Sequence, residues 1–262
     1  MINYKQLYER VGSVIGWDFS KITKRTKVVG KKWDYIKVVK KYINKETILL
    51  DIGTGGGELL LKIVPFVKKA YGIDHSRSMI KTARKNLAKS RISNVEFKLA
   101  DAKRMPFSKE YFNVVICRHS DFYPKEVFRI LKPNGIFITQ QVGEKDKENI
   151  KKIFRRGQHF GKRVGTLMKR YLQELKKAGF KILKKSTYNA LEYYANMEDL
   201  IFLLKNTLII PDFNIKKDQK FLEEIERRYK TKKGIKTNSF RFLIICKKPP
   251  CNSPHRLKKK SY

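Results

Sequence analysis

Cysteine, long apolar runs and acidic side chains are all scarce in this chain of 262 residues. The three cysteines are Cys117, Cys246 and Cys251, and none stands in a CxxC pair or in a Cys/His spacing typical of zinc sites. The sequence therefore predicts no metal site and no disulfide framework. No stretch of 18 apolar residues occurs, and residues 1–6 contain no apolar signal region. We expect a cytoplasmic protein with no membrane span.

The scarcity of acidic residues leaves the chain strongly basic. Lysine and arginine total 61 against 24 aspartates and glutamates, a formal net charge of +37, and residues 144–248 hold 28 basic and 12 acidic side chains. A field of this sign attracts polyanions such as RNA. Recognition of bases and phosphates, however, relies mainly on arginine, and here 45 lysines outnumber 16 arginines. A lysine-rich proteome explains the charge equally well, so both interpretations stay open.

Apolar and amphipathic stretches alternate through the first half of the chain. Strands are predicted at 47–52, 70–74, 94–99, 112–117 and 136–141, and helices at 31–43, 58–67, 78–89 and 125–131. This order is typical of a parallel, doubly wound α/β sheet. The second half is less regular, with helices predicted at 146–156, 167–178, 197–205 and 217–230 and strands at 180–188 and 239–246.

Composition divides the chain into three parts. Residues 1–30, with a short helix predicted at 3–15, form an N-terminal cap. Residues 31–248 form the main domain. Residues 249–262 are polar and basic, and we expect them to be disordered.

A glycine-dense segment, LLDIGTGGGE, occupies residues 49–58 between the first predicted strand and the next helix. Glycine permits positive φ and close approach of a ligand to the backbone. Ligands of such sheets bind at the carboxyl ends of the strands. A dinucleotide fingerprint would need glycine at position 58, where Glu58 would repel a pyrophosphate at the helix N-terminus. Asp51 and Glu58 therefore fit S-adenosylmethionine (SAM), which has no phosphate, better than NAD.

Two further acids end the next two strands. Asp74 would accept hydrogen bonds from both hydroxyls of a ribose, and Asp101 from an adenine amino group. Met79, Ala102 and Met105 would enclose the adenine ring. One aspartate after a strand is more often a helix cap, but three acids at consecutive strand ends form a specific pattern.

These motifs resemble those of a known enzyme family. The segments LLDIGTGGGE, YGIDHS, FKLADAKRMPF, YFNVVICRH and VFRILKPNGIFITQQV, within residues 31–143, are similar to the motifs of class I SAM-dependent methyltransferases. The likeness is strongest to the quinone-biosynthesis type. It implies a Rossmann-like sheet of seven mostly parallel strands with an antiparallel last strand, and residues 239–247 are similar to that strand.

The same resemblance implies a set of cofactor-binding residues. Those expected around the methionine part are Asp51, Gly53, Thr54, Gly55 and Gly57; those expected around the ribose and adenine are Asp74, His75, Met79, Asp101 and Ala102. Arg118 would lie next to the cofactor. The segments 15–20, 155–161, 192–207 and 234–244 look like a group of bacterial methyltransferases of unknown substrate, and they differ from the quinone enzymes.

The sequence points to no secure catalytic residue. The sulfonium of SAM already activates the methyl group. The protein must therefore mainly hold the nucleophile, the methyl carbon and the sulfur in one line and keep water away from them. A base is needed only if the nucleophile keeps its proton. His119 and Asp121 are candidates for such a base, and hydrogen bonding within their own loop explains them as well.

The leading functional prediction is methyl transfer to a small, partly apolar acceptor by a protein that is monomeric by default. Lid or roof elements are predicted at about 144–165 and 190–235, and Trp17, Phe19 and Phe202 would help to cover the acceptor. One alternative is methylation of rRNA or tRNA, which the basic charge favours. Another is a non-catalytic SAM-binding protein.

Overall fold

The computed structural model describes Ile22 and residues 24–250, and its strands form one mixed sheet. In chain order, the strands are β1 (Lys27–Val29), β2 (Ile48–Ile52), β3 (Lys69–Asp74), β4 (Val95–Leu99), β5 (Phe112–Arg118), β6 (Leu131–Val142), β7 (Lys181–Tyr194), β8 (Lys230–Thr231) and β9 (Gly234–Lys247). The helices are α3 (Tyr35–Lys40), α4 (Glu58–Ile63), the 3-10 helix η1 (Val64–Phe66), α5 (Arg77–Ala88), α6 (Pro124–Ile130), α7 (Glu148–Phe154), α8 (Thr166–Lys177), α9 (Met197–Lys205) and α10 (Gln219–Tyr229).

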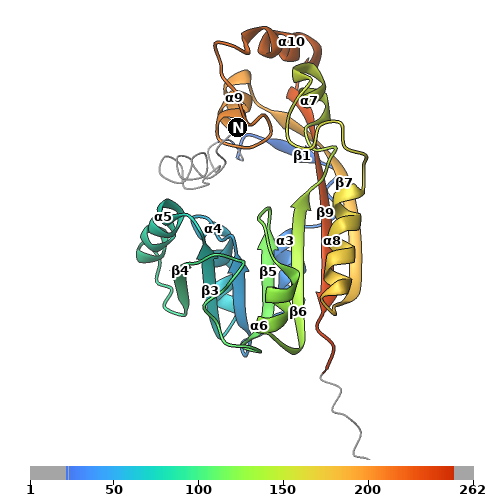
Figure 1. Cartoon of the computed structure of the whole chain (residues 1–262). Helices are drawn as coiled ribbons and strands as arrows, with labels where there is room; N and C mark the ends of the chain where they lie inside the picture. The colour runs from blue at the N-terminus through green and yellow to red at the C-terminus, as the bar shows by residue number, and fades with distance from the viewer. Residues whose placement is uncertain (1–21, 23, 251–262) are drawn as a thin grey trace, which may run out of the picture.

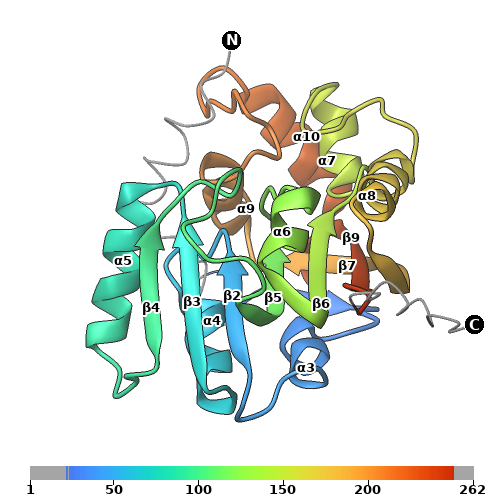
Figure 2. The same ribbon diagram turned by 60° about the horizontal axis from the view of Figure 1, so that its bottom comes forward.

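The sheet order confirms the predicted Rossmann-like architecture. The strands run β1-β7-β9-β6-β5-β2-β3-β4, with β8 attached to β9 (Figure 1). Strands β4, β3, β2, β5 and β6 are parallel and lie side by side in Figure 2, whereas β9 is antiparallel to both β6 and β7. Within the described residues the sheet has nine strands instead of seven, because the short β1 and β8 are added. Residues 27–29, predicted to belong to the cap, thus form part of the sheet.

Helices cover both faces of the sheet, and each face has its own core. Because side chains alternate along a strand, Leu50 and Ile52 point to the face covered by α6 and α8, and Leu49 points to the face covered by α3, α4 and α5. The side chains of Leu49, Leu50 and Ile52 are all buried. The parallel strands are therefore apolar on both sides, as buried parallel sheets require.

A third core lies beyond the carboxyl ends of the parallel strands. Helices α7, α9 and α10 pack there with the far ends of β7 and β9 (Figure 1), and we call this assembly the upper group. Its buried side chains include Phe154, Leu200 and Ile225. The segments predicted as lid or roof elements supply these helices. Residues 1–21, with the helix predicted at 3–15, Trp17 and Phe19, lie outside the described residues, as do Cys251 and the rest of the tail after residue 250.

Several boundaries differ from the predictions for a physical reason. Strands β7 and β9 are each 14 residues long and pair with each other past the rest of the sheet, up to Tyr194 opposite Ile235. Residues 189–194, beyond the predicted end of the strand at 188, therefore also belong to β7. Helix α9 begins after Asn196, as predicted, and the Asn196 side chain accepts a hydrogen bond from the Asp199 N–H at 2.9 Å.

Strand β7 has an edge that is only partly paired. Strand β1 pairs with Leu191–Tyr193 alone, and no other strand in the described part of the chain pairs with that edge. Toward its other end the strand carries the exposed side chains of Lys181, Lys184 and Lys185. Across residues 22 and 24–250, no helix is long and apolar enough to cross a membrane.

Candidate cofactor and acceptor site

The glycine loop connects β2 to α4 in a conformation that needs glycine. Gly53, Gly55 and Gly57 have φ values of 70°, 58° and 79°. A Cβ atom on Gly53 would lie 2.1 Å from the Ser120 Oγ, and one on Gly57 would lie 2.6 Å from the Phe97 ring. The loop is therefore held close to the segment that follows β5, and neither glycine could carry a side chain without displacing a neighbour.

Asp51 lies under this loop as a buried carboxyl group. Its residue is only 3% exposed, and burial raises the pKa of the carboxyl to about 7. The nearby Thr54 hydroxyl lowers the pKa, the Asp74 carboxylate raises it, and the Arg118 guanidinium lowers it. A cation placed against Asp51 would favour the ionised form. The site is thus suited to a ligand that presents a positive charge, as SAM does with its ammonium and sulfonium groups.

Asp74, the last residue of β3, joins the glycine loop to the start of α5. Its Oδ2 accepts a hydrogen bond from the Gly55 N–H at 3.0 Å, and its Oδ1 accepts one from the Ser76 N–H at 3.0 Å. Burial raises the pKa of this carboxyl, and the N–H donors partly offset the effect. A carboxylate offers about four lone-pair positions, so acceptor capacity remains for a ligand hydroxyl. His75 is exposed, with its Nδ1 3.7 Å from Asp74 Oδ1.

The residues predicted to enclose an adenine ring lie at two neighbouring strand ends. Met79, in the first turn of α5 after β3, is buried. After β4, Asp101 is exposed and accepts a hydrogen bond from the Lys103 N–H at 2.8 Å, Ala102 is half-buried and Met105 is buried. Since β3 and β4 are parallel neighbours, these side chains share the sheet edge that holds Asp74.

His119 follows β5 with a left-handed backbone, φ 57°. Its Nε2 lies 3.0 Å from the Gln140 amide nitrogen, and the Gln140 Oε1 accepts a hydrogen bond from the Trp33 Nε1 at 2.7 Å. Because an indole N–H only donates, the amide NH₂ must face His119, and His119 Nε2 accepts. Burial lowers the pKa of His119 well below its ordinary value, and the charges of Arg118 and Arg241 lower it further.

The neutral His119 ring therefore carries its proton on Nδ1 and has its Nε2 lone pair engaged. That arrangement does not favour Nε2 as a catalytic base. Asp121 is exposed in the same loop. The structure thus brings the predicted His119 close to two arginines and a glutamine, and leaves the predicted Asp121 at the surface.

Next to His119, five side chains form a group that we call the arginine cluster: Trp33, Arg118, Gln140, Tyr188 and Arg241. Arg118 is paired with Gln140 across β5 and β6, and Tyr188 with Arg241 across β7 and β9. Arg241 is also opposite Val142, two residues after Gln140, so these side chains point to one face of the sheet. The Trp33 and Tyr188 rings lie 4.5 Å apart, centre to centre.

Sequence reasoning gave no role to Trp33, Gln140, Tyr188 or Arg241. The one signal available was Arg241 itself, a charged residue inside the apolar segment Ser239–Cys246. A charge in such a strand usually serves a specific contact. The partners could not be identified, because the pairing register of β7, β9 and β6 was unknown.

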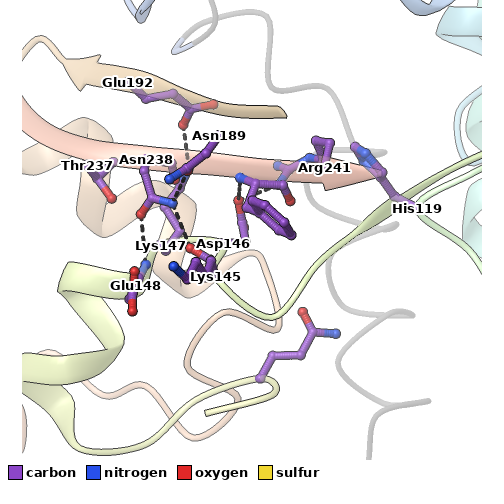
Figure 3. A network of polar contacts seen from close by, with 12 residues as sticks. His119, Lys145, Asp146, Lys147, Glu148, Asn189, Glu192, Thr237, Asn238 and Arg241 are labelled. Atoms are coloured by element: carbon purple, nitrogen blue, oxygen red, sulfur yellow. Dashed lines mark hydrogen bonds and ion pairs between the residues drawn. The ribbon is translucent and has the colours of Figure 1, made fainter. Parts of the chain in front are cut away.

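A buried polar network ties the start of the upper group to β7 and β9 (Figure 3). Arg241 forms an ion pair with Asp146, and Lys147 forms one with Glu192. Burial alone would raise the pKa of Glu192, but the Lys147 ammonium lowers it to about 2. Asn238 donates to the Lys145 carbonyl at 2.6 Å, which fixes the loop between β6 and α7. The network places Arg241 beside His119.

Comparison with known proteins agrees with this geometry. Residues 43–179, more than half of the chain, match the sequence family described as a methyltransferase domain. The chain belongs to this methyltransferase family. The B. subtilis methyltransferase YcgJ is 30% identical over 97 residues, which cover 34% of this chain and 38% of YcgJ. The demethylmenaquinone methyltransferase of Leptospira interrogans is 34% identical over 107 residues, 37% of this chain and 43% of that enzyme.

The matched stretch thus spans about two fifths of each of these relatives. Among solved structures, the YcgJ protein from B. subtilis has a TM-score of 0.60 at 19% identity, and the match covers 82% of this methyltransferase and 97% of YcgJ. A candidate methyltransferase of Bacillus halodurans has a TM-score of 0.61 at 21% identity, covering 82% and 99%. At these identities the structures share the fold.

Proposed function

We propose that this methyltransferase uses SAM and transfers the methyl group to a small, partly apolar acceptor. The observation that supports the cofactor most directly is Asp51, a buried carboxyl with a pKa near 7 beneath a loop of three left-handed glycines. A cationic ligand without phosphate suits this environment, and Glu58 at the start of α4 disfavours a pyrophosphate.

Named residues would each hold one part of SAM. Asp51 and the loop from Gly53 through Thr54 and Gly55 to Gly57 would hold the methionine part, and Asp74 would accept hydrogen bonds from the ribose hydroxyls. His75 would lie beside the ribose, and Met79, Asp101 and Ala102 would contact the adenine. When bound, SAM supplies a methyl group that its sulfonium has already activated.

The chain would then orient the acceptor and exclude water. The upper group, with the segments 144–165 and 190–235, stands beyond the carboxyl ends of the strands and would cover the reacting atoms. His119 would donate a hydrogen bond from Nδ1 and orient the acceptor, because its Nε2 is engaged by Gln140. We assign no base, since an acceptor that ionises on its own needs none.

Calorimetric titration with SAM tests the cofactor assignment. The variant Asp74→Asn should weaken SAM binding roughly 10- to 100-fold, because hydrogen bonds to a charged acceptor contribute about 1.5–3 kcal/mol. Glu46→Gln is the control. It removes the same charge from an exposed side chain outside the proposed site and should leave the affinity unchanged. Equal effects of the two variants would contradict the role given to Asp74.

Methyl transfer is tested with SAM labelled on its methyl group. The full chain is incubated separately with a small-molecule extract and with total RNA, both from cells lacking the gene. Label in small molecules supports the proposal. Label in RNA alone would replace it with the second candidate, an RNA methyltransferase, which the net charge of +37 favours. SAM binding without transfer to either would favour a non-catalytic binder.

A further inference from the structure

The arginine cluster contains hydrogen-bond donors that the rest of the described chain leaves unused. Arg118 makes no hydrogen bond or ion pair with any residue among 22 and 24–250. Arg241 uses its Nη1 for Asp146 and for the Phe240 carbonyl at 3.0 Å, and no described contact takes its Nε or Nη2. The hydroxyl of Tyr188, a residue only 7% exposed, likewise has no hydrogen-bond partner within the described ranges.

The charges around the cluster are not balanced. Asp146 is paired with Arg241, and Glu192 with Lys147, so these two acids are already compensated. Asp51 also faces Arg118, but it lies under the glycine loop, where the proposed cofactor would bring a positive charge. One positive charge therefore remains, and the guanidiniums of Arg118 and Arg241 repel each other. An anion between them would relieve this repulsion.

The position of the cluster fits the acceptor side of the site. Arg118 is the last residue of β5, at the sheet edge that carries Asp51 and Asp74. Trp33 and Tyr188 add an aromatic surface next to the guanidiniums. Guanidinium groups bind carboxylates and phosphates through paired N–H donors, and they also stack on aromatic rings.

We propose that Arg118, together with Tyr188 and the free N–H groups of Arg241, binds an anionic group of the methyl acceptor. The acceptor is then a small organic acid whose aromatic or apolar part packs on Trp33. This inference rests on the proposed function and narrows its substrate class from a small, partly apolar molecule to an acidic one.

Binding is measured by ligand-observed NMR on the full chain saturated with S-adenosylhomocysteine. The probes are benzoate and phenyl phosphate, with benzamide as the uncharged match. At least one acid should bind at least about tenfold more tightly than benzamide, and Arg118→Gln should remove this preference. Arg118→Lys keeps the positive charge but loses the paired N–H donors of the guanidinium, so it should retain part of the preference for the acid. Lys184→Gln, the same loss of charge far along β7, should have no effect.

A second variant guards against misfolding. Arg241→Gln alone would leave Asp146 unpaired, so it is combined with Asp146→Asn, and the double variant should also lower acid binding. Equal binding of all three probes would overturn the inference. So would a larger loss of SAM affinity than of acid affinity in Arg118→Gln, because Arg118 would then hold the cofactor's own carboxylate.

Transfer assays separate this inference from the proposed function. The small-molecule extract is divided by anion exchange, and each fraction is offered with labelled SAM. Label confined to the neutral fraction would overturn the anion site and leave the methyltransferase function intact. Preferential binding of an acid without transfer to any fraction would support the site and contradict the proposed function instead.

Discussion

The glycine loop and the upper group hold their polar side chains in different ways. Around the loop, contacts join residues close in sequence: Asp74 binds the N–H of Ser76, two residues on, and that of Gly55, 19 residues back. In the upper group, Lys147 reaches Glu192 over 45 residues, and Asp146 reaches Arg241 over 95. The proposed cofactor side is therefore built from one continuous stretch, and the proposed acceptor side from strands that meet only in the folded sheet.

This difference suggests which half can vary. A local loop keeps its geometry when distant segments change, whereas a site assembled by strand register changes with any of its strands. Relatives that share the first half can thus present different acceptor surfaces on one fold. The match to the methyltransferase family ends at residue 179, before β7 and β9 begin.

The largest effect is expected from breaking the buried pair in the upper group. In Lys147→Met, the Glu192 carboxylate would stay buried without its cation, and the free energy of unfolding should fall by about 3–5 kcal/mol. Denaturant titration followed by circular dichroism measures the change. The double variant Lys147→Met, Glu192→Gln should recover most of the loss. If the double variant is as unstable as the single one, the ion pair does not explain the stability of this region.

A smaller effect is expected from filling the glycine loop. Gly53→Ala would place a methyl group on Ser120 in a left-handed conformation, and should lower the free energy of unfolding by about 2–4 kcal/mol. Gly161, with φ 77° and no heavy atom within 4 Å of its Cβ position, gives the matched control. Gly161→Ala should cost only about 1 kcal/mol, from the backbone alone.

Adding Ser120→Gly to Gly53→Ala should remove most of the difference between the two alanine variants, because it takes away the side chain that the new methyl group meets. Thermal or denaturant unfolding of all four proteins measures this. Equal losses in Gly53→Ala and Gly161→Ala would show that the loop is not held against the β5 segment, and the contrast between a rigid cofactor side and a variable acceptor side would weaken.

The smallest effect concerns pH. With a pKa of about 7, Asp51 is mostly protonated at pH 6 and mostly ionised at pH 8. A cationic ligand binds the ionised form, so SAM affinity should rise roughly tenfold as the pH increases through 7, with release of a proton on binding at the lower pH. Calorimetric titrations with SAM at several pH values measure the affinity. Repeating them in buffers of different ionisation enthalpy measures the number of protons released on binding.

Asp51→Asn is the control for this experiment. The amino group of SAM titrates in a similar range, near 8 for an α-amine, and contributes equally to both proteins. The rise should therefore be steeper in the wild type than in the variant. Parallel pH profiles would remove Asp51 from the cofactor site.

The sequence predicted the first half of the fold well because its signals are local. The run Ile48–Ile52 followed by glycines predicts a strand and a turn without knowledge of the rest, and β2 and the loop are found there. The position of Asp74 at the end of a strand was equally predictable from the local sequence. The sequence did not predict that β7 continues through residues 189–194, because this extension depends on pairing with the distant strand β9.

The arginine cluster could not be predicted for a related reason. The pairing of Tyr188 with Arg241, and of Arg118 with Gln140, depends on the register of four strands from distant parts of the chain. A shift of one residue would turn these side chains to the opposite face. Only the folded sheet fixes that register.

The partly paired edge of β7 gives some of the positive charge a purpose that requires no ligand. Exposed strand edges invite another chain to add its own strand, which leads to aggregation. Lys181, Lys184 and Lys185 stand on the stretch of β7 that β1 leaves uncovered. Two copies meeting there would bring like charges together, so these lysines act as a barrier to intermolecular sheet growth. A part of the basic surface would thus disfavour the pairing of two sheets at this edge.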